Sequence, residues 1–298
     1  MDKIEFYKNR SLGERFSASA GFVRQNWKVM YKIILIPAIP LALLLGYFQQ
    51  VFLSGYTATV MEVANSGNFE DFYDIFGSMG IYLLGYLLLT VILYAISGAI
   101  MSRYEADLLT KETTLKDLSK KIVSNTGKLA LIILTMLLLG IVAVIIFALF
   151  VVLLTKISMV LLALVYFLFV VALIAMIPPL YLIFFPALFQ GTSIFKSIRK
   201  GLGLGFKNWG TTFVIVLIMG IATLAISSLL QIPYSIWLLS NVGQSITIVS
   251  YILGSLSALS SAIVTPLLFV FLAFQYFAIT EKAEGISLQA KIEEFDTL

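Results

Sequence analysis

The sequence predicts an all-α fold, a polytopic membrane helix bundle with six transmembrane helices, and three observations predict it. Apolar residues make up 60% of the 298 residues and charged residues only 12%, whereas a soluble domain contains about 45 to 50% apolar and about 25% charged residues. The mean hydropathy is +1.01. In addition, 73 consecutive residues between Lys207 and Glu281 carry no charge. Such a chain cannot cover an aqueous surface with polar groups, so we expect an integral membrane protein.

Six segments are long enough to cross a membrane, because a spanning helix needs about 20 predominantly apolar residues. None of the six contains Asp, Glu, Lys or Arg. They also lack the alternation of apolar and polar residues that marks β-barrel strands, so we expect helices. The six predicted spans are residues 33–53, 75–101, 129–154, 157–189, 211–239 and 245–280.

All seven prolines lie in or at the ends of these spans. A proline removes a backbone hydrogen bond and bends a helix. We therefore expect helix kinks at Pro37, Pro40, Pro178, Pro179, Pro186, Pro233 and Pro266. In the long fourth span, Pro178 and Pro179 are expected to divide the helix into two angled pieces. Such breaks either form a hinge or substrate cavity, or simply kink helices for packing, which is common in membrane proteins.

The basic residues predict the orientation, because 19 of the 20 fall on one side of the predicted membrane and only Lys156 falls on the other. Lys and Arg are retained on the cytoplasmic side. We therefore expect a multi-pass protein of the bacterial cytoplasmic (inner) membrane with both termini cytoplasmic. The predicted outer loop, residues 54–74, contains four acids and no base: Glu62, Glu70, Asp71 and Asp74. Tryptophan prefers the membrane interface, so Trp27, Trp209 and Trp237 are expected to act as interface anchors.

The chain also shows an internal repeat. A shift of 182 residues aligns Asn26 and Trp27 with Asn208 and Trp209 without a gap. We expect one membrane domain, residues 1–298, made of three two-span repeats in parallel orientation, each preceded by an amphipathic cytoplasmic interfacial helix. The predicted repeats are residues 1–110, 111–191 and 192–298, and a C-terminal amphipathic helix covers residues 286–298.

The amphipathic segments place apolar and basic residues on different faces, as helices in the plane of a membrane surface do. The apolar stripes are Leu12, Phe16, Val23 and Trp27, and Ile194, Ile198, Leu202, Phe206 and Trp209. Each basic group near an anionic leaflet adds about 1 kcal/mol to binding. The candidate contacts for anionic lipid headgroups are Arg15, Arg24, Lys28, Lys120, Lys121, Lys196, Arg199, Lys200 and Lys207. Alternatively, these segments are ordinary linker helices packed under the bundle.

Two further patterns concern helix starts and helix packing. Ser11 with Glu14, and Thr114 with Asp117, have the spacing of a capping box, which marks a helix start. Small residues at intervals of four let helix backbones approach closely. They recur in the sixth span, so we expect this face to pack against another helix, within the chain or in a homo-oligomer: Ser250, Gly254, Ala258 and Ala262.

The composition excludes several kinds of chemistry. The chain has no histidine and no cysteine, so it cannot build the usual zinc, haem or iron–sulfur sites, a Ser-His pair or a thiol nucleophile. The glycines Gly201, Gly203 and Gly205 follow a membrane span and not a strand, so they do not predict a nucleotide site. A surface turn there remains a candidate lipid-headgroup contact. We expect no enzyme, with no catalytic residue, no metal ligand, no cofactor and no nucleic acid partner.

Segments 11–27 and 193–209, each with an Asn-Trp pair directly before a span, resemble bacterial six-helix membrane proteins related to the membrane domain of glycerophosphodiester phosphodiesterases. The resemblance implies a six-helix membrane domain. It does not carry over the hydrolase activity, because the family's catalytic part is a separate soluble barrel. The longest polar stretch here is the 32-residue N-terminal arm, which is too short to encode one.

Two functions fit these patterns. The first is a non-enzymatic membrane protein that organises or senses lipid, or supports a protein partner, through its basic amphipathic helices. The alternative is a transporter or channel for a hydrophobic or neutral solute, with a cavity at the proline-broken helices. Many transporters use inverted repeats and place ionisable residues within the membrane. The predicted parallel repeats and uncharged spans therefore favour the first function.

Overall fold

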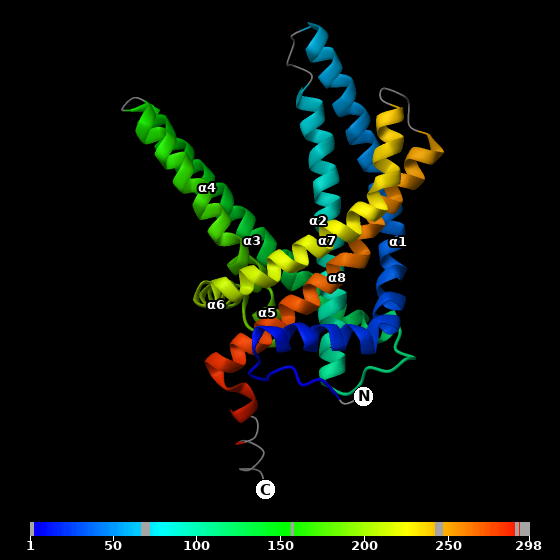
Figure 1. The fold of residues 1–298 in the computed structure, drawn as a ribbon, viewed down its shortest axis with the longest axis vertical. Coiled ribbons are helices and arrows are strands. Elements are labelled where there is room, and N and C mark those ends of the chain that lie inside the picture. The colour runs from blue at the N-terminus through cyan, green and yellow to red at the C-terminus, as the bar shows by residue number, and fades with distance from the viewer. Residues whose placement is uncertain (1–2, 67–71, 156–157, 242–246, 290–291, 293–298) are drawn as a thin grey trace. The chain divides into compact units, whose positions relative to one another are not determined.

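The computed structural model describes residues 3–66, 72–155, 158–241, 247–289 and 292 (Figure 1). Every regular element in these ranges is a helix, so the described fold is all-α as predicted. The helices are α1 (Leu12–Ser66), α2 (Phe72–Glu105), α3 (Leu115–Thr155), α4 (Met159–Leu182), α5 (Phe185–Phe189), α6 (Ile194–Lys207), α7 (Trp209–Ser240) and α8 (Ile248–Glu284). A further helical segment covers residues 286–289.

Six of these helical segments are long and apolar enough to cross a membrane, which confirms the six predicted spans. They cover Leu12–Leu53, Gly77–Glu105, Leu115–Thr155, Met159–Phe189, Trp209–Leu229 and Ile248–Glu284. By helix length and composition, the chain is a multi-pass membrane protein. Several predicted features lie outside the described residues: Lys156, Glu70, Asp71 and the end of the predicted C-terminal helix.

The helix boundaries differ from the prediction in two ways. The predicted outer loop is mostly helical, because α1 continues to Ser66 and α2 already begins at Phe72. The first two amphipathic segments also run directly into their spans within α1 and α3, and Gly127 at the junction in α3 does not interrupt the helix. Both predicted capping boxes form at the starts of these helices. The carboxylate of Glu14 accepts the Ser11 N–H at 2.7 Å, and that of Asp117 accepts the Thr114 N–H at 2.8 Å.

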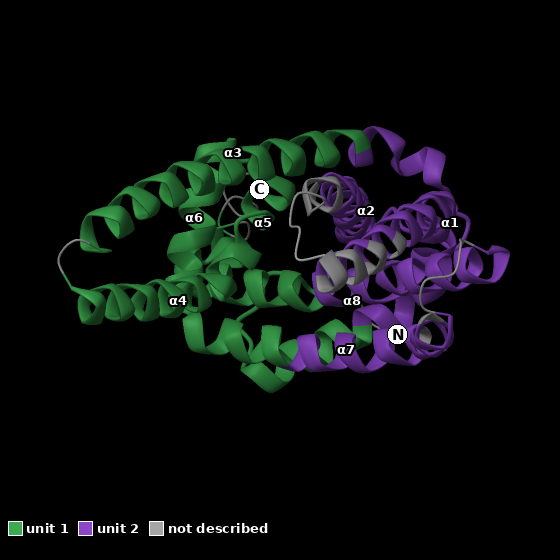
Figure 2. Cartoon of the chain, turned by 90° about the horizontal axis from the view of Figure 1, so that it is seen from above, with its two compact units in different colours: residues 1–21, 123–217, 271–298 green, residues 22–122, 218–270 purple. Residues whose placement is uncertain are grey.

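The chain forms two compact units, each built from segments that are far apart in the sequence (Figure 2). Unit 1 comprises Met1–Gly21, Val123–Leu217 and Phe271–Leu298, and unit 2 comprises Phe22–Ile122 and Ile218–Val270. These boundaries cut across the three predicted repeats, so the repeats stay a prediction.

In unit 2, α1 and α8 pack backbone to backbone. A Cβ atom added to Gly46 would lie 2.2 Å from Ser255 Oγ and 2.5 Å from the Ser255 backbone nitrogen. Gly254 faces Gly46 in turn, with its added Cβ 3.2 Å from the Gly46 carbonyl oxygen. The predicted small-residue face of α8 is buried at all four positions: Ser250, Gly254, Ala258 and Ala262. This face therefore packs within the chain.

Two polar side chains of α1 form hydrogen bonds in the apolar part of unit 2. The amide nitrogen of Gln50 donates to the Tyr234 hydroxyl at 2.9 Å and to the Ser250 carbonyl at 3.0 Å. The Tyr31 hydroxyl donates to the Ile263 carbonyl at 2.6 Å. These bonds join α1 to α7 and α8. They satisfy polar groups that would have no water to bond with in the core of a bilayer.

In unit 1, α3 and α4 form a long apolar hairpin. Near the turn, the rings of Phe147 and Phe169 stack at 3.9 Å. Away from the turn, α6 lies between the two helices (Figure 2), where Ile132, Ile183 and Ile198 form a buried cluster. Most of the remaining hairpin surface consists of exposed Leu, Ile, Val and Phe side chains. An apolar surface of this extent is suited to hydrocarbon.

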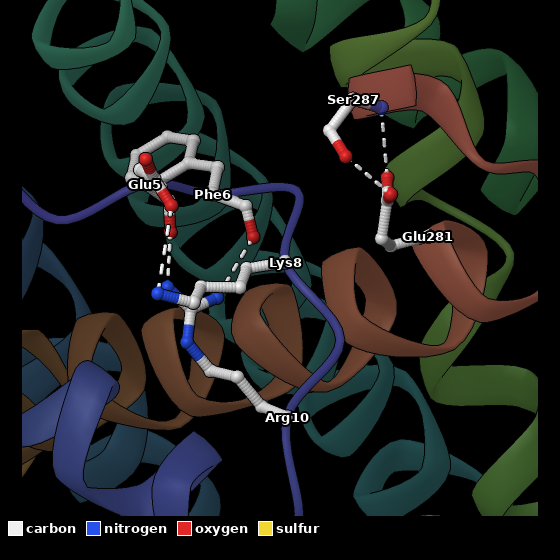
Figure 3. Close-up of polar contacts among 6 residues, drawn as sticks. All are labelled: Glu5, Phe6, Lys8, Arg10, Glu281 and Ser287. Carbon is white, nitrogen blue, oxygen red and sulfur yellow. Dashed lines mark hydrogen bonds and ion pairs between the residues drawn. The ribbon is translucent and has the colours of Figure 1, made fainter. Parts of the chain in front are cut away.

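The N-terminal arm of unit 1 packs against the end of α8. The Phe6 ring is 4% exposed and stacks on Phe277 at 4.8 Å. Arg10 donates to the backbone carbonyls of Glu5 and Phe6 (Figure 3). The same view shows Ser287, after α8, donating to the Glu281 carboxylate. The segment around Phe6 and the segment around Ser287 therefore both contact the last turns of α8.

The α1 and α8 contact predicts opposite outcomes for two glycines of α1. Gly46→Ala must push against the Ser255 backbone, and such overpacking costs about 1 to 3 kcal/mol. Gly55 has no atom within 4 Å of an added Cβ, so Gly55→Ala gains about 0.5 to 1 kcal/mol of helix propensity. Thermal unfolding in detergent should show a lower midpoint for the first variant and an equal or higher one for the second. Equal midpoints for both variants would contradict the packing.

Candidate functional site

Helix α6 is the centre of the candidate site, and its local sequence explains its limits. Ser193 precedes it in an extended conformation (φ −65°, ψ 159°). The Asn208 side chain ends it by donating to the Leu204 carbonyl at 3.0 Å. Asn208 also separates α6 from α7, so this amphipathic segment is a helix of its own.

The inner face of α6 contacts the end of the fourth span through small residues at intervals of four: Ser197, Gly201 and Gly205. A Cβ atom added to Gly201 would lie 2.4 Å from the Ile183 Cα, and one added to Gly205 would lie 2.4 Å from the Pro179 Cα. Only glycine allows this approach. The sequence predicts small-residue packing in the sixth span. In α6 the same spacing coincides with the alternating glycines Gly201, Gly203 and Gly205, so periodicity alone does not distinguish the packed glycines from the exposed one.

The fourth span is broken, but one helical turn later than predicted. Helix α4 continues through Pro178 and Pro179 to Leu182, and α5 begins at Phe185, next to Pro186. The Ser197 hydroxyl occupies this break: it accepts the Ala187 N–H at 2.9 Å and donates to the Ile183 carbonyl at 2.6 Å. An unbroken helix would join these two backbone groups directly, so a side chain of α6 completes the backbone bonding of the span.

Proline explains a second contact between the fourth span and the chain after α6. Because Pro179 has no N–H, the carbonyl of Ala175 loses its helical partner four residues on. The Trp209 indole N–H donates to this carbonyl at 2.8 Å. Trp209 also stacks on Phe213, with ring centroids 4.9 Å apart. Trp209, which the sequence predicts as an interface anchor, is thus hydrogen-bonded and packed within unit 1.

Two charged side chains add to the site. Lys128 of α3 donates from Nζ to the Ala187 carbonyl at 3.0 Å, at the end of the broken span, where a cation is favoured by the helix dipole. Lys200 of α6 forms an ion pair with Glu284 at the end of α8. Lys200, a predicted lipid contact, therefore has a protein partner.

The outer face of α6 is exposed and mixes aromatic with basic side chains. Phe195 is 75% exposed and Phe206 is 50% exposed. Lys196, Arg199 and Lys207 are exposed beside them. The stripe expected to face lipid is divided: Ile198 is buried in the cluster of unit 1 and Ile194 and Leu202 pack against that cluster, whereas Phe206 remains outside. Helix α6 is thus packed on the protein by one face and open on the other.

Most other predicted lipid contacts are exposed as well. Arg24, Lys28, Lys120 and Lys121 are exposed on α1 and α3. Trp27 is 51% exposed, and the Lys28 ammonium lies 5.6 Å from its ring centroid. The remaining tryptophan, Trp237, is partly buried in α7.

Arg15 is placed differently from the expectation. It is 8% exposed, and its Nη1 donates to the Gln275 side-chain oxygen at 2.6 Å. The Gln275 amide nitrogen in turn donates to the hydroxyls of Thr211 and Thr212 at 3.0 and 2.9 Å. Apolar periodicity could not reveal this network, because the buried face of the helix start carries an arginine and a serine, Ser19, in place of apolar residues.

The described residues contain no group of three or more acidic side chains placed to hold a metal ion. The site therefore offers hydrogen-bond donors, cations and exposed aromatic rings. Comparison with family models, with curated proteins and with solved structures found no match for this chain. The resemblance to the phosphodiesterase membrane domain stays a prediction from the residues alone.

Two glycines of α6 provide a matched test of the docking face. Gly201→Ala places a methyl group against the Ile183 backbone and should destabilise the protein by about 1 to 3 kcal/mol. Gly203, two residues away, has no atom within 4 Å of an added Cβ, so Gly203→Ala should leave stability equal or higher. Hydrogen exchange of α6 amides should accelerate only in the first variant. Similar exchange in both would show that α6 is not docked as described.

The bond from Trp209 to the proline-freed carbonyl predicts a second difference. Trp209→Phe keeps an aromatic ring but leaves the Ala175 carbonyl without its donor, which costs about 1 to 3 kcal/mol. Trp27→Phe removes no bond of this kind and should change stability by less than about 0.5 kcal/mol. Denaturant or thermal unfolding of the two variants provides the measurement. If Trp209→Phe leaves the stability unchanged, the indole acts only at the membrane interface.

Proposed function

We propose that this protein is a non-enzymatic protein of the bacterial cytoplasmic membrane that organises or senses lipid, or supports a protein partner, through its basic amphipathic helices. The observation that carries the proposal is the outer face of α6. There, exposed Phe195 and Phe206 stand beside exposed Lys196, Arg199 and Lys207. Aromatic side chains that enter the headgroup region and cations that meet lipid phosphates are the features of an interfacial helix.

The inner face of α6 favours sensing over passive anchoring. Through Ser197, α6 completes the backbone hydrogen bonds at the break in the fourth span. A shift of α6 on the membrane surface would therefore disturb the end of a transmembrane helix. In this proposal, the lipid composition of the inner leaflet acts on the fourth span through α6.

The proposed orientation places both termini and all the amphipathic helices in the cytoplasm. The asymmetry of basic residues supports it, and so does the packing of the N-terminal arm on the end of α8, which fits an even number of crossings. The proposed repeat is supported by one recurring contact. Asn26 donates from its side chain to the Phe22 carbonyl at 2.9 Å, and Asn208 donates in the same way to the Leu204 carbonyl at 3.0 Å.

The alternative function, transport of a hydrophobic or neutral solute through a cavity at the proline breaks, has less support from the geometry. Helix α1 continues through Pro37 and Pro40. At the break in the fourth span, Leu182, Ile183 and Ala187 are at most 2% exposed. The side chains of α6 fill this break.

The proposal predicts a preference for anionic lipid that depends on the exposed cations of α6. In bilayers with spin-labelled lipids, the protein should associate more strongly with phosphatidylglycerol than with phosphatidylcholine, and salt should weaken this preference. Neutralising Lys196, Arg199 and Lys207 together to Gln should reduce the preference, since each cation contributes about 1 kcal/mol.

The matched control neutralises Lys8, Lys111 and Lys116, which are also exposed but lie outside α6. This variant has the same change in net charge and should keep more of the lipid preference. A preference that is insensitive to salt and equal in both variants would refute the role of α6.

A further inference from the structure

Two arginines in unit 1 are buried without an ion-pair partner. Arg10 and Arg15 are each 8% exposed. Within the part of the chain that the structure describes, no carboxylate makes an ion pair with either. Glu5 and Glu14 are near enough to raise the pKa of Arg10, but burial has the larger effect and lowers it. An arginine keeps its charge in spite of such shifts, so both positive charges persist.

All hydrogen-bond partners of the two guanidinium groups are neutral. Arg10 donates to the backbone carbonyls of Glu5 and Phe6, and its guanidinium carbon lies 5.8 Å from the Phe274 ring centroid. Arg15 donates from Nε to the Arg10 carbonyl at 2.9 Å and from Nη1 to Gln275 at 2.6 Å. Carbonyl dipoles and an amide thus hold both groups in position. Glu5 and Glu14 offset part of the Arg10 charge, whereas the bonds of Arg15 go to neutral groups alone.

A buried charge without a counter-ion is costly, and natural proteins pair such charges. Arg15 still has unused donors, because Nη2 makes no bond to the described chain. The Arg15 guanidinium is bonded to Gln275, and Gln275 is bonded to Thr211; these two residues belong to the predicted inner ends of the sixth and fifth spans. The anion available at that level of a bilayer is the lipid phosphate, which guanidinium groups bind through parallel N–H bonds.

We propose that Arg15, with Arg10 beside it, binds the phosphate of one anionic phospholipid at the inner end of unit 1. The inference rests on the proposed lipid contact and narrows it to one bound molecule held by buried cations. In the proposed function, the exposed cations of α6 contact many lipids that exchange rapidly. The site at Arg15 instead binds one lipid molecule and becomes saturated. Gln275 orients Arg15 and is in turn held by Thr211 and Thr212.

The test is titration of the full chain in detergent with phosphatidylglycerol, phosphatidylcholine or inorganic phosphate, followed by native mass spectrometry and thermal unfolding. We expect the wild-type chain to retain one phosphatidylglycerol and to unfold at a higher temperature with it. Arg15→Gln should weaken this binding by about tenfold or more, as the loss of a charge-assisted hydrogen bond does. Lys111→Gln, which removes one positive charge at an exposed position outside the candidate lipid contacts, should leave it unchanged.

Gln275→Glu provides a second variant that does not depend on the folding of Arg15→Gln. It places a carboxylate within bonding distance of Arg15 and so supplies the missing counter-charge inside the protein. We expect this variant to lose the bound phosphatidylglycerol while its unfolding temperature without lipid is equal or higher. Gln289→Glu adds the same charge at an exposed position after α8 and should keep the lipid.

Retention of phosphatidylglycerol by both Arg15→Gln and Gln275→Glu would overturn the inference. Stabilisation by inorganic phosphate but not by phosphatidylglycerol would overturn it too, because the ligand would then be a free anion. The variant with three neutral residues in α6 separates this site from the proposed function. If that variant has lost its general lipid preference but keeps one lipid that depends on Arg15, the site stands on its own.

Discussion

The constraint that governs this structure is that hydrocarbon offers no hydrogen bonds, so the chain must satisfy its own polar groups. Proline and the break in the fourth span release backbone groups that would otherwise be bonded within the helix. In two of these places a specific side chain bonds to the released group. The Trp209 indole donates to the Ala175 carbonyl. The Ser197 hydroxyl donates to the Ile183 carbonyl and accepts the Ala187 N–H. These donors come from α6 and the start of α7, so α6 completes the backbone bonding of the fourth span.

Close backbone approach is the second requirement, and glycine provides it where helices must bond to one another. Helix α6 can bring its serine hydroxyl into the break only because Gly201 and Gly205 let the two backbones touch. Gly46 and Gly254 do the same between α1 and α8, where Gln50 bonds to Tyr234 and Ser250. In both units, small residues and buried polar bonds therefore occur together, as is common where membrane helices associate.

The six spans and the capping boxes were predictable, since length, apolarity and local spacing determine them. The sequence does not predict which side of an amphipathic helix faces the protein. In α6, Ile198 and Phe206 belong to one apolar stripe, yet the first is buried and the second exposed. Arg15 was expected on the surface because charge normally predicts exposure, and only the tertiary contact with Gln275 buries it. The N-terminal arm was missed because Phe6 lies outside any periodic segment, and its partner Phe277 is distant in the sequence.

The docking of Phe6 on Phe277 has a consequence for biosynthesis. Phe6 is synthesised long before α8, so it can stack on Phe277 in unit 1 only after the end of α8 has emerged. Contacts of such long sequence separation form late and slowly. During translation the first spans are therefore inserted while the segment before them is still without its final partner. Synthesis of α8 must therefore be complete before the aromatic contact that joins the two distant segments of unit 1 can form.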